Sequence, residues 1–206
     1  MSASLEERLA SVDGAIADAA RDAGRRPAEL TRIVVTKFQP ASLVRELAAL
    51  GVSDFGENRH QEAEAKAEEV ADLDLTWHFV GQLQSNKARQ VRRYARVVHS
   101  VDREALVTAL ASDAGTILDC FVEVDLSGEP GRGGAPPSEV PGLADQIAEA
   151  QGLRLAGVMA VAPLGAPPRP GSPLRSTSTK QSSCEPSSEA SAVTRPSRST
   201  EWTTRA

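Results

Sequence analysis

The feature that most constrains the fold is a regular alternation of short apolar segments with helical patterns. Predicted strands begin at residues 32, 54, 76, 96 and 118, so one strand–helix unit recurs about every 22 residues. Each apolar segment leads into a helical pattern, which disfavours hairpins and predicts a parallel sheet of the α/β class. The predicted strands span 32–37, 54–58, 76–81, 96–101, 118–126 and 153–161.

Helical patterns fill the segments before and between these strands. Apolar residues at steps of three and four predict an opening amphipathic helix that ends at Gly24 and Pro27. A second helix ends at Gly51, and residues 60–73 combine helix formers with charge pairs spaced i,i+4. Residues 138–152 predict a further helix with Ser138 as its N-cap.

Parallel strand–helix units form either a closed (β/α)8 barrel or an open doubly wound sheet. No GxGxxG follows the first strand, which weakens the dinucleotide-binding form of the open sheet. We therefore predict a (β/α)8 TIM-barrel that is incomplete, with about six units. Its first and sixth strands are then expected to be open edges.

The composition changes abruptly after Pro163. Ser, Thr, Pro and Arg dominate the rest of the chain, and no Leu follows Leu174. Such a segment has too little apolar surface to offset its chain entropy, which predicts a barrel domain at 1–163 and a disordered tail at 164–206. Because the change comes directly after a strand, a shifted reading frame is the favoured hypothesis, with a natural flexible tail as the alternative.

Composition and charge narrow the class of protein. With 40% apolar and 25% charged residues, the chain has the composition of a soluble globular protein. Its net charge of −5 provides no overall electrostatic attraction to nucleic acid or to anionic membranes. No signal peptide or membrane span is found, so a cytoplasmic location is expected. Cys120 and Cys184 are too far apart for a disulfide framework or zinc site, and Cys120 is expected in the core. The basic segment 84–96 predicts a solvated helix face.

The first strand, within RIVVTKFQP, ends near a lone lysine. Alternation places Ile33, Val35 and Lys37 on the inner face, at the carboxyl end of the strand where barrels carry their functional groups. Desolvation disfavours the charged form of an amine, and a neutral amine attacks aldehydes, so Lys37 is a candidate Schiff-base lysine. By spacing alone, a lysine that extends to water remains the commoner alternative.

Five blocks of sequence carry a family resemblance. In their order and spacing they resemble the pyridoxal phosphate homeostasis protein family (the YggS or PROSC type), which is related to the barrel domain of alanine racemase. The resemblance runs from about residue 5 to about residue 163. The blocks are VVTKFQP, FGENRHQEAEAK, WHFVGQLQSNKAR, HSVD and LRLAGVMAV.

The resemblance implies a barrel that binds pyridoxal 5′-phosphate (PLP) as an internal aldimine on Lys37. It places Asn58 beside the cofactor and Met159 under the cofactor ring. His78 and Gly81 belong to the third-strand motif, where packing and loop geometry are their expected roles. No catalytic residue and no metal ligand is assigned.

The chain departs from the family after its sixth strand. The family has two further strands with a Ser-x-Gly-Met-Ser-type loop and an Arg-x-Gly-Thr/Ser-type loop that bind the cofactor phosphate, and neither motif is found here. PLP is therefore expected to bind weakly or not at all. The segment Arg132–Gly134 falls in a glycine-containing loop of the family.

The implied function is PLP binding and control of its free level, without an assigned reaction, by a monomer that supplies PLP-dependent apoenzymes. One alternative is an alanine-racemase-like enzyme, but racemisation needs a second base, and the single tyrosine, Tyr94, lies on a predicted helix. Another alternative is a frameshift product without function.

Overall fold

The computed structural model describes residues 3–111, 115–128, 131–161, 178–179 and 189–194. The strands are β1 (Leu30–Val35), β2 (Asp54–Glu57), β3 (Thr76–Phe79), β4 (Ala95–Val101), β5 (Leu118–Glu123), β6 (Leu153–Val161), β7 (Ser178–Thr179) and β8 (Glu189–Thr194). The helices are α1 (Leu5–Asp22), α2 (Ala41–Ala49), α3 (His60–Glu69), α4 (Ala88–Tyr94), α5 (Glu104–Leu110) and α6 (Val140–Glu149), with 3-10 turns η1 (Pro27–Glu29) and η2 (Ser85–Lys87).

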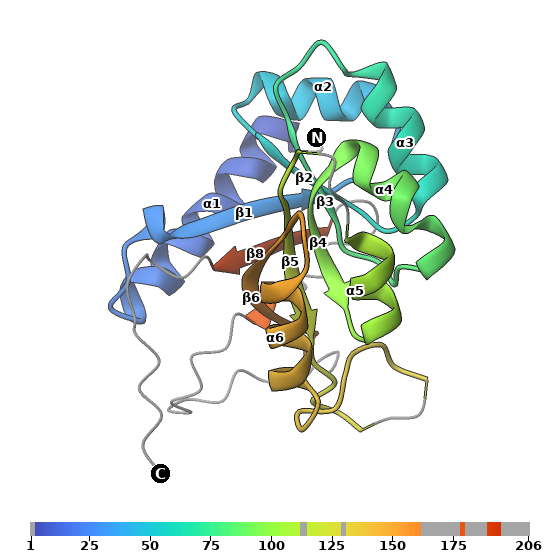
Figure 1. Ribbon diagram of the computed structural model, residues 1–206. Helices are drawn as coiled ribbons and strands as arrows, with labels where there is room; N and C mark the ends of the chain where they lie inside the picture. Colours follow the sequence, from blue (N-terminus) through green and yellow to red (C-terminus); the bar gives the residue numbers. More distant parts are fainter. Residues whose placement is uncertain (1–2, 112–114, 129–130, 162–177, 180–188, 195–206) are drawn as a thin grey trace.

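Strands β1 to β6 form a curled parallel sheet in which each strand pairs with the next along the chain. Helices α2 to α6 cover the outside of the curl (Figure 1). Helix crossovers return each strand in the same direction, so the carboxyl ends of all six strands lie along one edge. The prediction of an incomplete (β/α)8 barrel with six units is confirmed.

The edges of this sheet differ from the prediction. Strand β8 pairs antiparallel with β1, from Leu30 opposite Thr194 to Val35 opposite Glu189, and the short β7 pairs parallel with β6. The prediction that the first and sixth strands are open edges is therefore wrong. An edge strand presents free N–H and C=O groups that any extended segment can pair with, whatever its composition. The other residues of the tail lie outside the described residues, and the division at residue 163 stays a prediction.

Apolar side chains alternate between two layers across the sheet. Val34 and Phe55 belong to an outer cluster between sheet and helices, whereas Ile33 lies in an inner cluster on the concave side. The inner cluster also contains Val97, Phe121 and Met159. The predicted inward direction of Ile33 is thus confirmed, and the concave side is filled by side chains, as in other barrels.

The helix ends follow local chemistry that the sequence predicted only in part. Helix α1 begins with a capping box in which Ser4 accepts from the Glu7 amide and Glu7 accepts from the Ser4 amide. The prediction that Ser138 caps α6 is wrong, because the N-cap is Glu139 and makes no side-chain cap bond. Pro141 lies in the first turn and has no N–H to donate, so a capping side chain would gain less there.

The basic segment is helical, and Arg89 and Arg93 are exposed as expected. Arg92 differs, since its guanidinium is directed at the backbone and links α4 to three other parts of the chain. It donates to the carbonyl oxygens of Leu110, Thr116 and Gly152.

Cys120 is fully buried in the core between sheet and helices, as predicted. Burial raises the pKa of its thiol to about 12, which disfavours a reactive thiolate. Cys184 lies outside the described residues. Within the part of the chain that the structure describes, no helix has the length and apolarity needed to cross a membrane.

Substitution of Phe55 tests the packing of the outer cluster. It is fully buried and its ring centroid lies 5.9 Å from that of Trp77. We expect Phe55→Ala to lower the free energy of unfolding by about 3–5 kcal/mol, because a cavity replaces the ring. Chemical denaturation measures this loss, with Ile117→Ala as the control because Ile117 is 54% exposed. Equal losses for the two variants would contradict the described packing.

Candidate functional site

A cavity of about 220 Å³ opens at the carboxyl-end edge of the sheet. Its lining comes from the loops that follow β2, β3 and β5 and from the end of β6. In parallel barrels the functional groups lie on this edge. The lining residues are Asn58, Val80, Gly81, Gln82, Glu123, Val124, Asp125, Leu126, Arg132, Gly133 and Val161.

Asn58 directly follows β2 and lines this cavity, so one predicted site residue lies in it. Its side-chain Oδ1 is buried and has no hydrogen-bond partner among the described residues. A buried polar atom without a partner is costly unless a ligand or water satisfies it. The amide is therefore suited to contact a polar ligand in the cavity.

Gly81 permits the close contact between two of the loops that form the cavity. A Cβ atom at this position would lie 2.3 Å from the Asn58 carbonyl oxygen and 2.8 Å from the Asn58 Cα. Only a residue without a side chain lets the two backbones approach so closely. The expected role of Gly81 in loop geometry is thus confirmed.

Glu123, at the end of β5, gives the cavity a titratable group. Burial, reinforced by the nearby Asp102, raises the pKa of its carboxyl to about 7, and Arg132 opposes this shift. The pKa of neighbouring Asp125 is lowered instead, because it accepts hydrogen bonds from the Ser127 side chain and from the Ser127 and Gly128 amides. The cavity thus holds two acids with opposite tendencies to ionise.

Lys37 and Met159 lie outside this lining. Strand β1 ends at Val35, and Lys37 follows two residues later in a turn, half-buried. Strand alternation therefore predicts the direction of Ile33 but not that of Lys37. Met159 is buried in the inner cluster and lies opposite Glu123 in the register of β5 and β6. The three predicted site residues thus come from the ends of β1, β2 and β6, and Asn58 alone of them lines the cavity.

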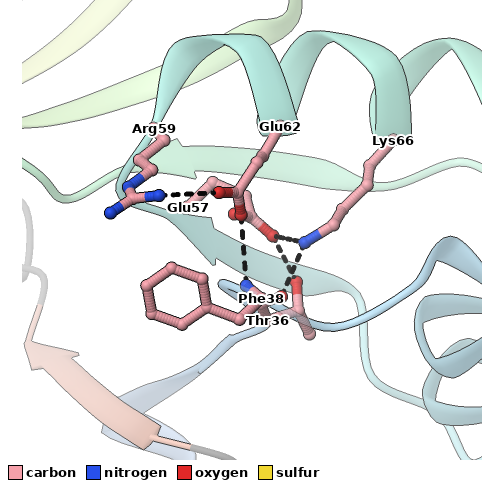
Figure 2. A network of polar contacts seen from close by, with 6 residues as sticks. All are labelled: Thr36, Phe38, Glu57, Arg59, Glu62 and Lys66. Carbon is pink, nitrogen blue, oxygen red and sulfur yellow. Dashed lines mark hydrogen bonds and ion pairs between the residues drawn. The ribbon is translucent and has the colours of Figure 1, made fainter.

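A polar network surrounds the turn that carries Lys37 (Figure 2). Lys66 Nζ contacts Glu57 Oε1 at 2.7 Å, and Glu62 Oε2 accepts from the Phe38 amide at 3.1 Å. This network was not predicted, because the charged residues of 60–73 were interpreted only as i,i+4 pairs within their own helix. The available signal was Glu57 itself, an acid at the end of a strand, which requires a partner when buried.

A second polar chain crosses the concave side of the sheet. His78 Nδ1 lies 2.9 Å from His99 Nε2, and His78 Nε2 lies 3.0 Å from Asp54 Oδ1. The His99 ring stacks on Phe121, with 4.8 Å between centroids. Burial, and then His78, hold the pKa of His99 well below its usual value, so this ring is neutral at pH 7. His78 is buried in this chain of contacts, and its expected packing role stays a prediction.

Known proteins resemble this chain in sequence and in fold. The family model described as alanine racemase, N-terminal domain, matches residues 33–181. A pyridoxal phosphate homeostasis protein of Pseudomonas aeruginosa is 42% identical over 160 residues, which cover 76% of this chain and 70% of that protein. The chain belongs to the pyridoxal phosphate homeostasis protein family. The relative of that name in Corynebacterium glutamicum is 43% identical, over 72% of this chain and 71% of its own length.

Solved structures of the family agree with this assignment. PipY of Synechococcus elongatus with PLP bound is 36% identical, with a TM-score of 0.66 over 79% of this chain and 73% of PipY. PipY without PLP gives a TM-score of 0.68 at 38% identity, over 80% of this chain and 74% of PipY. Alanine racemase from E. faecalis, at 15% identity and a TM-score of 0.55 over 74% of this chain and 42% of its own, shares the fold alone.

Substitution of Gly81 tests its close contact with the Asn58 backbone. We expect Gly81→Ala to lower the free energy of unfolding by about 1–3 kcal/mol, since the new Cβ forces the Asn58 backbone away. Gly142→Ala is the matched control, because it lies in α6 with no atom within 4 Å of the added Cβ and should gain about 0.5–1 kcal/mol. Denaturant unfolding of both variants measures the difference, and a neutral Gly81→Ala would contradict the contact.

Glu123 predicts a pH dependence of stability. Its carboxyl keeps its proton to about pH 7 when folded, against a usual pKa of 4.5, so the folded state binds more protons between these values. Its contribution to stability therefore falls as the pH rises through this window. We expect the free energy of unfolding of Glu123→Gln, relative to the original chain, to increase from pH 5 to pH 8. Glu104→Gln, at an exposed position, is the control; parallel pH curves for all three proteins would contradict the assignment.

Proposed function

We propose that this chain binds PLP covalently through Lys37 and acts in controlling the level of free PLP. The observation that carries the proposal is the position of Lys37, half-buried in the turn after the first strand of a barrel whose relative PipY was solved with PLP bound. PLP would supply an aldehyde, and the Lys37 Nζ would attack its carbonyl carbon, so that a C=N bond replaces the C=O bond and water leaves.

Two further residues are proposed to contact the cofactor. Asn58 offers a buried amide oxygen that lacks a partner among the described residues, which suits a polar ring substituent. Met159 offers a buried thioether, in the same inner cluster as Ile33 of β1, the strand that precedes Lys37, which suits an aromatic ring. The residues present thus fit the aldehyde and ring of PLP.

This chain offers fewer binding groups for the phosphate of PLP than the family does. The two phosphate-binding loops expected from the family are not found in the sequence after residue 163. Each lost charge-assisted hydrogen bond weakens binding by roughly 1.5–3 kcal/mol. We therefore propose that PLP affinity is low, and that a chain with these loops restored would bind PLP tightly. A frameshift product without a cellular role stays the alternative if no PLP binds.

We propose a homeostasis protein rather than an enzyme. Tyr94, a candidate second base, lies on α4 and stacks on His60. It packs against the outer cluster of Phe55 and against the core cluster of Cys120, and it is not among the residues that line the cavity. Burial raises its pKa well above the usual value, which disfavours the phenolate that a base requires. In this proposal the protein is a cytoplasmic monomer that supplies PLP-dependent apoenzymes.

One observation keeps a racemase as the second candidate. Glu123 faces the cavity with a pKa of about 7, so it could exchange a proton near neutral pH. A racemase assay with added PLP, on the original chain and on Glu123→Gln, separates the two. PLP-dependent activity that is lost in the variant would favour the enzyme, and inactivity of a PLP-loaded original chain would favour the homeostasis protein.

Lys37→Ala tests the central proposal. After incubation with PLP and borohydride reduction, we expect a pyridoxyl adduct at Lys37 in the original chain at a yield about tenfold or more above that at Lys87. Mass spectrometry of the digest locates the adducts. Lys37→Ala should lose the preferential adduct, whereas Lys87→Ala should keep it. Equal labelling of Lys37 and Lys87 would overturn the proposal.

A further inference from the structure

A buried ion pair between the end of β2 and helix α3 lies beside the turn that carries Lys37. Glu57 is fully buried and Lys66 is 8% exposed, with 2.7 Å between Lys66 Nζ and Glu57 Oε1. Glu57 Oε2 is buried and has no hydrogen-bond partner among the described residues. A buried pair that is only partly satisfied contributes little net stability, because desolvation of the two charges opposes their attraction. The pair therefore affects the position of the backbone more than it affects stability.

The pair fixes the residue directly before Lys37. Lys66 Nζ donates to the Thr36 carbonyl oxygen at 2.6 Å, and Thr36 Oγ1 donates to Glu57 Oε1 at 2.7 Å. The Thr36 amide donates to the Gly56 carbonyl oxygen at 3.0 Å. All three polar groups of Thr36 are therefore bound, so the chain enters the turn at Lys37 from a fixed position.

The residue directly after Lys37 is fixed in a strained conformation. Phe38 has φ of 64°, which a bulky residue rarely adopts, and the residue is 64% exposed, so burial does not impose this backbone. Its amide instead donates to Glu62 Oε2, and the Arg59 guanidinium lies 4.9 Å from the ring centroid. Strained residues persist where surrounding contacts over-determine them, and they concentrate at functional sites.

Helix α3 supplies both contacts from one face. Glu62 and Lys66 are spaced i,i+4, so they lie side by side and point toward the turn (Figure 2). Glu62 binds the amide of Phe38 while Lys66 binds the carbonyl of Thr36, one on each side of Lys37. The face of α3 is thus complementary to one conformation of this turn.

We propose that Lys66 and Glu62 are positioning residues for Lys37: together with Glu57 they hold the turn Thr36–Phe38 in the conformation from which Lys37 reacts with PLP. This inference rests on the proposed function of Lys37. It assigns α3 a role in the reaction that does not require contact with the cofactor, because the helix acts through the backbone on both sides of the lysine.

The first arm of the test measures the turn without cofactor. Glu62→Ala removes the acceptor of the Phe38 amide, and we expect hydrogen exchange of that amide to quicken about tenfold. Glu68→Ala is the matched control, since Glu68 lies exposed on the same helix and should leave this exchange unchanged. Unchanged exchange in Glu62→Ala would overturn the inference.

The second arm measures the reaction with PLP. In Glu62→Ala we expect the rate of borohydride-trapped labelling at Lys37, relative to Lys87 in the same molecule, to fall about tenfold, and Glu68→Ala should retain the original ratio. General destabilisation would affect both lysines, so the ratio reports on position. Faster exchange at Phe38 with an unchanged labelling ratio would overturn the inference.

A third variant tests Lys66 without leaving a buried charge alone. Lys66→Met alone would strand the Glu57 carboxylate, so Lys66→Met is combined with Glu57→Gln, which keeps an acceptor for Thr36. We expect a folded protein with the same tenfold loss in the labelling ratio. If this variant fails to fold, Glu62→Ala still decides the inference. If the original chain shows no preference for Lys37, the proposed function fails, while the exchange arm still reports whether α3 holds the turn.

Discussion

Parallel pairing of six consecutive strands is the constraint on which the rest of the structure depends. Because each crossover helix returns the chain in the same direction, the carboxyl ends of β1 to β6 share one edge of the sheet. Lys37, Asn58, Glu123 and Met159 are far apart in sequence, yet each lies at or near such an end. The strand topology therefore brings these residues to one edge, independently of any contact between their side chains.

A second set of groups fixes the loops at this edge. Gly81 lets one loop approach the Asn58 backbone, and the pair of Lys66 and Glu57 fixes Thr36 beside Lys37. In both cases the residue that shapes the site acts on a neighbour's backbone. Loops at this edge thereby take defined positions, which a binding site built on loops requires.

The elements could be predicted from the sequence because they depend on local periodicity. Alternation in β1 predicted the inward direction of Ile33, and the strand–helix repeat predicted the six-unit barrel. Other features depend on partners distant in sequence. Residues 60–73 were predicted to pair their charges within one helix, but Lys66 is buried and pairs with Glu57 of β2. The pairing of β8 with β1 was missed for the same reason, since an edge accepts partners by backbone geometry and not by composition.

By itself, the sequence determined the order of strands and helices, the family and the lysine that the family resemblance assigns to the cofactor. It could do so because apolar periodicity and motif spacing are properties of neighbouring residues. Only the tertiary structure decided that Lys37 lies in a turn beyond β1, that Phe38 takes a strained backbone, and that Lys66 and Glu62 hold that turn from outside. These outcomes depend on burial and on hydrogen bonds between distant segments, which form only when the sheet brings those segments together.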